Sequence, residues 1–325
     1  MIWLTWRQHR GEMVWAVFLL ALLAALLFLS SRAMFTAYAQ VQHGTSVAVC
    51  ARSHSQDAVC DALKGEFYNQ FGGASVLLLA LTILPGLVGM FFGAPLVARE
   101  IERATNRLAW TQGITRLRWL WVKLGALVLS TAALFAAFAL LLSWWRGPLD
   151  LVGGERFEYG FDLEGVAPVA YAVFALALGV AAGALLRRTL PAMAVTLGCF
   201  VALRGVIEFA LRPRFLPPIA RVTDPGQGNP TPYNGDWVLN NGFAYLDRQG
   251  HAISSADATQ LCSNVAKGGA FNFNACLQQQ GIHLLNHYQP ADRFWLFQGI
   301  ESGIFFGLAV VLLALAVWWV MTRLT

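Results

Sequence analysis

Long apolar segments separated by polar ones dominate the pattern of this chain. Six of them are long enough to cross a membrane as helices, since about 20 helical residues span its hydrocarbon core. They are Val14–Phe35, Val76–Val97, Trp119–Trp145, Pro168–Leu186, Leu190–Leu211 and Phe294–Val320. No alternating pattern of about ten residues indicates a barrel. The pattern therefore predicts an all-α polytopic membrane protein with six transmembrane helices, whose backbone amides are satisfied within each helix.

The polar segments divide the chain into four parts. Residues 1–13 mix tryptophans with arginines, which suits an interfacial helix or simply a positively charged flank. Residues 14–211 hold the first five spans, with a charged cytoplasmic loop at 98–118. Residues 212–293 predict a small mixed extracellular subdomain between helices 5 and 6, with strand-like runs, a helix capped by Ser255 and a shorter helix around Cys276. Residues 294–325 hold the sixth span and a short cytoplasmic tail.

Composition and charge agree with this class and add an orientation. The chain of 325 residues is 57% hydrophobic and only 13% charged, which is typical of an integral membrane protein. Basic residues in short segments gather on one side, which the positive-inside rule assigns to the cytoplasm. Both termini are then cytoplasmic in a multi-pass protein of the cell membrane, and the net charge of +5 reports topology rather than nucleic-acid binding. The basic residues assigned to the cytoplasmic side are Arg7, Arg10, Arg99, Arg103, Arg107, Arg116, Arg118, Lys123, Arg187, Arg188 and Arg323.

Four of the five cysteines lie in loops assigned to the outside, where an oxidising compartment favours disulfides. The simplest connectivity is local, Cys50 with Cys60 and Cys262 with Cys276. Spacing alone leaves the other two connectivities open. Cys199 lies within the fifth span.

Three charged residues fall inside the fifth and sixth predicted spans, where an unpaired charge is costly. Arg204 and Glu208 are one helical turn apart on the fifth span, and Glu301 lies on the sixth. Arg204 and Glu301 each lie about seven residues from the outer boundary, roughly 10 Å deep. We expect Arg204 to pair with Glu301, with Glu208 as a second partner nearer the surface. The pair either ties the two helices together or belongs to an outer gate.

Glycines at four-residue spacing line single helix faces and indicate close helix packing. Such stripes serve packing within the chain or an interface between subunits. Pro85 and Gly86 should also bend the second span. The stripes are Gly89 and Gly93, Gly179 and Gly183, and Gly299, Gly303 and Gly307.

The sequence lacks the motifs of several enzyme classes. It contains no GxxxxGK[ST], HExxH or GxSxG run, so it has no P-loop of its own and no familiar hydrolase signature. His283 and His287 are expected to be exposed loop residues, and no metal site is predicted. An acidic loop is expected to be solvated, although a lipid-linked glycosyltransferase would use such acids to hold a metal. Its residues are Glu155, Glu158, Asp162 and Glu164.

The charged loop after the second span suits docking to another protein, because it mixes acids, arginines and Trp110 in an amphipathic run. This loop and three other runs make the chain resemble the permease subunit of a type 2 ATP-binding cassette (ABC) exporter, of the actinobacterial drug or natural-product kind. The resemblance covers essentially the whole chain. It is carried by residues 2–10, 99–102, 107–112, 190–194 and 288–295, and is specific in combination.

The resemblance implies a second copy of the permease and two separate nucleotide-binding subunits, which bind ATP and magnesium and hydrolyse the ATP. It makes the charged loop a coupling helix that docks into the ATPase, although Ala104 stands where relatives often have glycine. The implied coupling residues are Glu100, Glu102, Thr105, Arg107 and Gln112. Spans two and five would line a largely apolar substrate path at Leu81, Phe92, Met193, Thr196 and Phe200.

The predicted function is export of a lipophilic or amphipathic small molecule or peptide, as in multidrug efflux. ATP hydrolysis in the partner would drive alternating access, and the chain itself would carry no cofactor and no ATPase site. The main alternative is a non-transporting, ABC-coupled sensor or immunity protein that signals through its extracellular subdomain. A membrane-embedded transferase using the outer acids is a third possibility.

Overall fold

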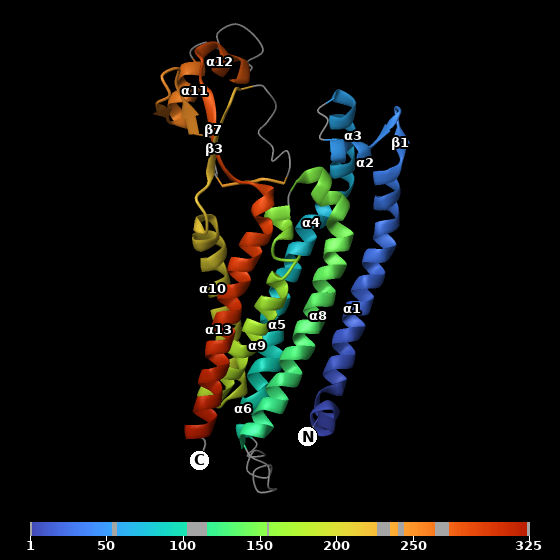
Figure 1. Cartoon of the computed structure of the whole chain (residues 1–325), viewed down its shortest axis with the longest axis vertical. Helices are drawn as coiled ribbons and strands as arrows, with labels where there is room; N and C mark the ends of the chain where they lie inside the picture. Colours follow the sequence, from blue (N-terminus) through green and yellow to red (C-terminus); the bar gives the residue numbers. More distant parts are fainter. Residues whose placement is uncertain are drawn as a thin grey trace.

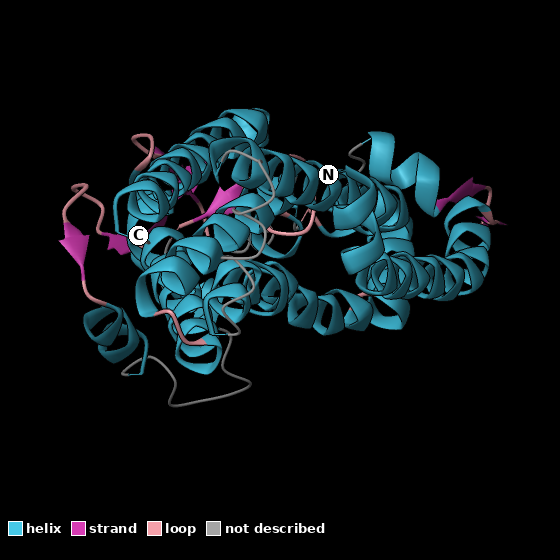
Figure 2. Ribbon diagram, turned by 90° about the horizontal axis from the view of Figure 1, so that it is seen from below, coloured by secondary structure: helices cyan, strands magenta, loops and turns pink. Residues whose placement is uncertain are grey.

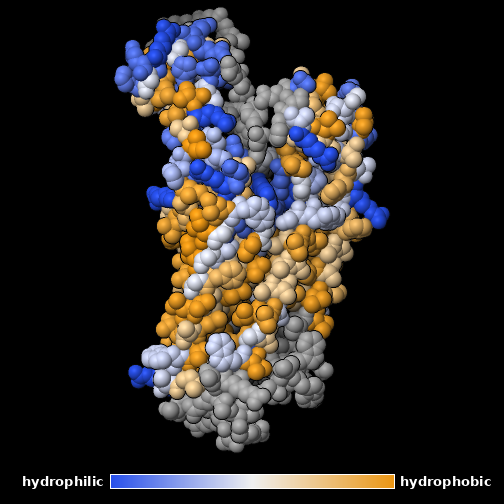
Figure 3. All heavy atoms as spheres, viewed as in Figure 1, coloured by the Kyte–Doolittle hydropathy of each residue, from blue (hydrophilic) through white to orange (hydrophobic). Residues whose placement is uncertain are grey.

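The computed structural model describes residues 2–53, 57–102, 116–154, 156–225, 235–239, 244–263 and 273–323. In this part of the chain, six segments are long and apolar enough to cross a membrane, which confirms the expected all-α polytopic fold. On the face drawn in Figure 3, a broad hydrophobic band covers the helices and hydrophilic atoms gather toward one end. The segments are Val14–Ala39, Leu79–Arg99, Trp121–Gly153, Ala167–Leu186, Thr189–Arg214 and Ala291–Arg323.

The spans are built mainly on five long helices that run roughly along one axis (Figure 1). Both termini lie at one end of this bundle, which we call the termini end, and a small subdomain lies at the other, the subdomain end. Helix α1 is continuous, so no helix boundary separates residues 1–13 from the first span. The helices are α1 (Ile2–Ala39), α8 (Arg116–Gly153), α9 (Ala167–Leu186), α10 (Thr189–Val206) and α13 (Phe294–Arg323).

The second span is not a regular α-helix. Pro85 has no amide hydrogen to donate, and the α-helical pattern is interrupted next to it, as its position predicted. A 3-10 turn precedes this point and a π-helical turn follows it. The segments are α4 (Gly73–Leu78), η1 (Leu79–Ile83), α5 (Leu84–Val88), η2 (Gly89–Gly93) and α6 (Ala94–Glu102).

Helix α9 is the centre of the bundle, with 78% of its most apolar window buried against 11% for α1. Its glycines let the second span approach closely. A methyl group added to Gly89 or to Gly179 would overlap the backbone of the opposite helix, and one on Gly183 would overlap Ala94. These two stripes therefore pack within the chain. The third stripe differs, since Gly299, Gly303 and Gly307 have open space beside them in the described part of the chain.

The subdomain between α10 and α13, which we call the sheet subdomain (219–289), combines short strands with two helices. Strand β7 (His283–Gln289) is central, and β3 (Ile219–Thr223) pairs antiparallel with it along five residues. The sheet order is β3-β7-β5-β6, and β4 also pairs with β7. The remaining elements are β4 (Trp237–Val238), β5 (Ala244–Leu246), β6 (Ala252–Ile253), α11 (Ser255–Ser263) and α12 (Phe273–Gln280).

Two local details of the sheet subdomain differ from the sequence predictions. Ser254, not Ser255, caps α11, since its hydroxyl accepts the Asp257 amide hydrogen (3.1 Å) and the Asp257 carboxylate accepts the Ser254 hydroxyl (2.7 Å). This reciprocal pair is a capping box moved one residue toward the N-terminus. His283 and His287 lie in strand β7 rather than in a loop, and His283 contacts Asp224 at 2.6 Å.

Both predicted disulfides are present. Cys50–Cys60 joins α2 (Val47–Ser53) to α3 (Ala58–Phe71), next to a hairpin of β1 (Val41–Gln42) and β2 (Thr45–Ser46). Cys262–Cys276 joins α11 to α12 inside the small core of the sheet subdomain. The hairpin and the larger sheet lie at opposite ends of the elongated outline seen from below (Figure 2). The local connectivity is therefore confirmed.

Candidate functional site

A buried cluster of charges, which we call the sealed cluster, lies at the subdomain end of α9, α10 and α13. The fifth span continues beyond α10 as a π-helical turn, η4 (Ile207–Leu211), and a 3-10 turn, η5 (Arg212–Arg214). Each of the five side chains is at most 8% exposed. The members are Asp162, Tyr171, Arg204, Arg212 and Glu301.

Arg212 bonds to both acids of the sealed cluster. Its Nε and Nη2 atoms donate to the two carboxylate oxygens of Glu301 at 2.7 and 2.8 Å, a bidentate pairing. Nη2 also reaches Asp162 at 2.7 Å. Tyr171 donates its hydroxyl hydrogen to Glu301 at 2.6 Å. Glu301 is thus neutralised and hydrogen-bonded at 0% exposure, which a buried carboxylate needs.

The expected pairing of Arg204 with Glu301 is confirmed, but it is not the closest contact of either residue. Their atoms approach to 3.5 Å, whereas Arg204 lies 2.5 Å from Asp162. Glu208 is the second partner as expected, at 3.6 Å and one-third exposed. Arg212 was not predicted as a member of the cluster, although the four-residue spacing from Arg204 through Glu208 leads directly to it.

The prediction that the acidic loop is solvated is wrong for two of its members. Asp162 is 8% exposed and Glu164 is 2% exposed, because the loop between α8 and α9 folds back into the bundle. Burial by itself would raise the pKa of Asp162, but Arg212 and Arg204 outweigh it and hold that pKa below its ordinary value. Glu158 is exposed as expected, and Glu155 lies outside the described residues.

Gln298 of α13 fixes the loop that carries both buried acids. Its side-chain oxygen accepts the amide hydrogens of Val166 and Ala167 at 3.1 and 2.8 Å, which caps the start of α9. Its nitrogen donates to the Phe161 carbonyl at 2.7 Å. One buried amide therefore satisfies three backbone groups and holds the loop against α13.

A second group of charges, the open cluster, lies on the other side of the same loop and consists of Arg146, Asp150, Arg156 and Glu164. Arg146 donates to Glu164 at 3.0 Å and to Asp150 at 2.8 Å, and is 1% exposed. Arg156 donates to Glu164 at 3.3 Å but is 36% exposed. Within the described residues, Nη1 of Arg146 is buried without a hydrogen-bond partner.

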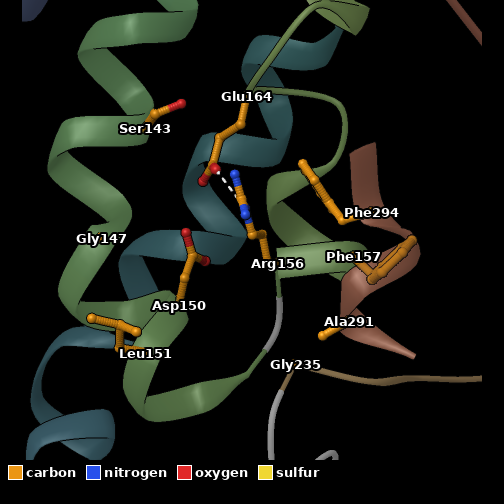
Figure 4. Close-up of a pocket in the computed structure, with 10 residues that line it drawn as sticks. All are labelled: Ser143, Gly147, Asp150, Leu151, Arg156, Phe157, Glu164, Gly235, Ala291 and Phe294. Atoms are coloured by element: carbon orange, nitrogen blue, oxygen red, sulfur yellow. Dashed lines mark hydrogen bonds and ion pairs between the residues drawn. The ribbon is translucent and has the colours of Figure 1, made fainter. Parts of the chain in front are cut away.

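The open cluster borders a cavity of about 360 Å³ between α8, the π-helical turn η3 (Arg156–Gly160) and the start of α13. In Figure 4, Asp150, Glu164 and the Arg156 guanidinium converge on one space from different elements. Phe157 and Phe294 form part of the wall. The Arg156 guanidinium stacks over Phe294, 4.0 Å from the ring centre, and lies 5.2 Å from that of Trp295.

One of the expected coupling residues has a role inside the chain. Glu102, the last residue of α6, accepts the Thr189 amide hydrogen at 3.0 Å and the Thr189 hydroxyl at 2.6 Å. It thereby caps the first turn of α10 from the end of the second span. Glu100 belongs to α6, and Thr105, Arg107 and Gln112 lie outside the described residues.

The expected substrate-path residues do not meet in this single chain. Leu81, Phe92 and Phe200 pack in three different apolar clusters, and Met193 packs against a fourth. Thr196 is fully buried and donates to the Ala192 carbonyl at 2.6 Å. Phe200 also fills the space beside Gly86 of the second span. A path through these positions remains a prediction.

Comparison with known proteins identifies the family. The family model described as ABC-2 membrane transporter related matches residues 17–212, more than half of the 325 residues. No curated protein and no solved structure matches the chain. The match covers the first five spans, the loop with both buried acids, and Arg212. The chain is a multi-pass membrane protein that belongs to the ABC-2 membrane transporter-related family of permeases.

Proposed function

We propose that this chain is the permease subunit of an ABC exporter that exports a lipophilic or amphipathic small molecule or peptide. A separate subunit hydrolyses ATP, and alternating access of two permease copies moves the cargo. Both termini face the cytoplasm. Membership of the ABC-2 family supports this proposal, and so does the largely apolar lining offered by the second and fifth spans. The closest functional kind is an actinobacterial drug or natural-product exporter.

The observation that carries the proposal is the contact of Glu102 with Thr189. The segment after Glu102 is the expected docking loop for the ATPase, and Thr189 opens the fifth span. A displacement of the loop therefore reaches α10 through two hydrogen bonds to its first turn. Helix α10 carries Arg204 near its other end, about 22 Å away at 1.5 Å per residue. The sealed cluster would then form part of a gate, in which its ion pairs either oppose the motion of α10 or move with it.

The second permease copy is supported by small residues on helix faces turned away from the chain. Gly198 and Gly205 of α10 have open space beside them, as do the three glycines of α13. Apolar helix faces meet lipid without any glycine, whereas small residues permit close approach of another helix. These faces suit a homodimer in which α10 or α13 lies at the contact.

Co-purification tests the proposal. The tagged chain is purified from its native membrane in mild detergent, and the product is analysed by mass spectrometry and ATPase assay. We expect a subunit with a P-loop to co-purify with the wild-type chain in a stoichiometric amount. The same subunit should be absent when the Arg107→Glu variant is purified. Glu102→Gln should keep the partner but lower cargo-stimulated ATP hydrolysis, while Glu66→Gln, an exposed acid on α3, should behave as wild type. Recovery of the chain alone, without nucleotide-dependent activity, contradicts the proposal.

A signalling role is the second candidate, and the extent of the family match favours it. The match ends at Arg212, so the sheet subdomain (219–289) lies beyond it. Such a subdomain suits an external ligand or partner. Reconstituted vesicles separate the two functions. ATP-dependent accumulation of a lipophilic dye supports export, whereas ATPase activity that responds to external protein without any cargo movement supports signalling.

A further inference from the structure

The cavity of the open cluster has the composition of a site for an organic cation. Its wall contains two carboxylates, from Asp150 and Glu164, a hydroxyl group from Ser143, and two phenyl rings. A primary ammonium group donates three hydrogen bonds and accepts none, which matches three acceptor groups. Aromatic faces add attraction for a cation that has left bulk water.

Both carboxylates retain acceptor capacity in the chain as it stands. A carboxylate offers about four lone-pair positions. Glu164 accepts one hydrogen bond on each oxygen, from Arg146 and from Arg156, and Asp150 accepts one from Arg146. A further donor can therefore bind without breaking the buried Arg146 contacts.

Charge balance identifies which group gives way to a cation. The open cluster pairs two arginines with two acids, so an added ammonium would leave an excess positive charge in a half-buried place. Arg146 is 1% exposed and bonds to both acids, whereas Arg156 is 36% exposed and makes one ion-pair contact of 3.3 Å beside its stacking on Phe294. Arg156 can turn into water at small cost, because a half-exposed ion pair contributes little.

We propose that this cavity binds the ammonium group of an amphiphilic primary amine, which displaces Arg156 from Glu164 and lies between Glu164 and Asp150. In the absence of ligand, the Arg156 guanidinium occupies the place proposed for the ammonium group, over the aromatic rings that would contact the ligand. The cavity lies near Trp295, an exposed tryptophan of the kind that gathers at a membrane boundary. The apolar chain of the ligand can therefore remain in lipid. This proposal does not depend on ATP-driven transport.

Binding is measured by titration calorimetry on the purified full-length chain in a neutral sugar detergent, with decylammonium as the probe. Decyl sulfate serves as the anion of equal chain length. We expect decylammonium to bind roughly tenfold or more tightly than decyl sulfate. Asp150→Asn should weaken decylammonium binding about tenfold, because the amide that replaces the carboxyl group cannot form a charged pair with the ammonium group. Arg156→Gln should strengthen it several-fold by removing the internal competitor.

Control variants separate binding from folding. Asp61→Asn and Arg52→Gln change exposed charges on α3 and α2 and should leave the binding constant unchanged. Ala291→Leu fills the cavity from its uncharged wall, so it tests the site even if Asp150→Asn destabilises the protein. We expect it to abolish decylammonium binding. Equal binding of cation and anion, unchanged binding by Ala291→Leu, or weaker binding by Arg156→Gln would overturn the proposal.

Nanodiscs distinguish two natural sources of the ammonium group. Added phosphatidylethanolamine in phosphatidylcholine nanodiscs competes with decylammonium if an aminophospholipid headgroup is the ligand. Absence of competition, with decylammonium still bound, assigns the site to free amphiphilic amines. Either result supports an ammonium site, and neither bears on whether an ATPase partner exists.

Discussion

Asp162 and Glu164 are separated by one residue in the loop between α8 and α9, yet they belong to clusters with opposite properties. Asp162 enters the sealed cluster, where each member has ionic or hydroxyl partners within the chain. Glu164 enters the open cluster, which borders a cavity and includes a half-exposed arginine. Ionisable residues near a membrane thus have to be judged by the completeness of their partners. A complete set of partners within the chain indicates a structural role for the residue, and an incomplete set indicates a binding role.

The strongest test of this contrast removes a charge from the sealed cluster. Glu301→Gln leaves Arg212 without its bidentate partner at nearly zero exposure, and we expect a loss of about 3–5 kcal/mol in unfolding free energy. Thermal unfolding of the purified variant in detergent measures this loss. Glu66→Gln is the matched control on the exposed face of α3. A stable Glu301→Gln variant would mean that the cluster is not structural.

A double-mutant cycle ranks the partners of Glu301. We expect a coupling of about 2 kcal/mol between Arg212→Gln and Glu301→Gln, and clearly less between Arg204→Gln and Glu301→Gln, because the distances are 2.7 and 3.5 Å. The same unfolding assay supplies both cycles. The swap Arg204→Glu with Glu301→Arg should not recover expression, since the introduced guanidinium would face Arg212. Recovery would show that Arg204 is the dominant partner.

Loss of the loop anchor should affect both clusters to an intermediate degree. Gln298→Leu leaves two backbone amides and one carbonyl without their buried partner, at a cost of about 1–3 kcal/mol. Gln298→Glu keeps the acceptor for the amides and should lose less. Hydrogen exchange at Val166 and Ala167 reports the local opening, and unchanged exchange in Gln298→Leu would contradict this role.

The open cluster should tolerate the loss of its exposed member. Arg156→Gln is expected to change the unfolding free energy by less than about 1 kcal/mol, since Arg156 is 36% exposed and makes one ion-pair contact. Calorimetric unfolding of Arg156→Gln and Glu301→Gln under the same conditions compares the two losses directly. A loss as large as that of Glu301→Gln would remove the distinction between the two clusters.

The smallest expected effect is that of pH on the sealed cluster. The pKa of Asp162 is lowered from 3.8 in the folded protein, so its contribution is complete above that ordinary value and disappears as the pH falls through the folded value. The stability difference between wild type and Asp162→Asn should therefore stay constant from about pH 8 to about pH 5 and shrink only in stronger acid. Unfolding midpoints across this range provide the check. A difference that shrinks near neutral pH would show that Asp162 is not held in its charged form.

Features set by local pattern could be predicted from the sequence. The six spans follow from apolar length, and the two disulfides from cysteines close in sequence. The contact of Arg204 with Glu301 follows from equal depth on two spans. Each depends on residues near one another in sequence or on the fixed rise of a helix.

Features that depend on the path of a loop back into the bundle could not be predicted from local sequence pattern. Asp162 and Glu164 look like solvated acids because no periodicity describes the segment between α8 and α9. Its course is decided by Gln298, more than a hundred residues away. The cap on Thr189 by Glu102 was missed for the same reason, since charge alone pointed to an external partner.

The β3–β7 ladder links the sheet subdomain directly to the helices of the sealed cluster. Strand β3 follows the end of the fifth span, and β7 leads through η6 (Ala291–Arg293) into α13, so five paired residues couple the two helices outside the bundle. A relative rotation of α10 and α13 would therefore tilt the subdomain. Under the proposed function, fluorescent labels on the subdomain would follow the transport cycle in real time. An antibody fragment that binds the subdomains of two copies together would arrest that cycle without entering the membrane.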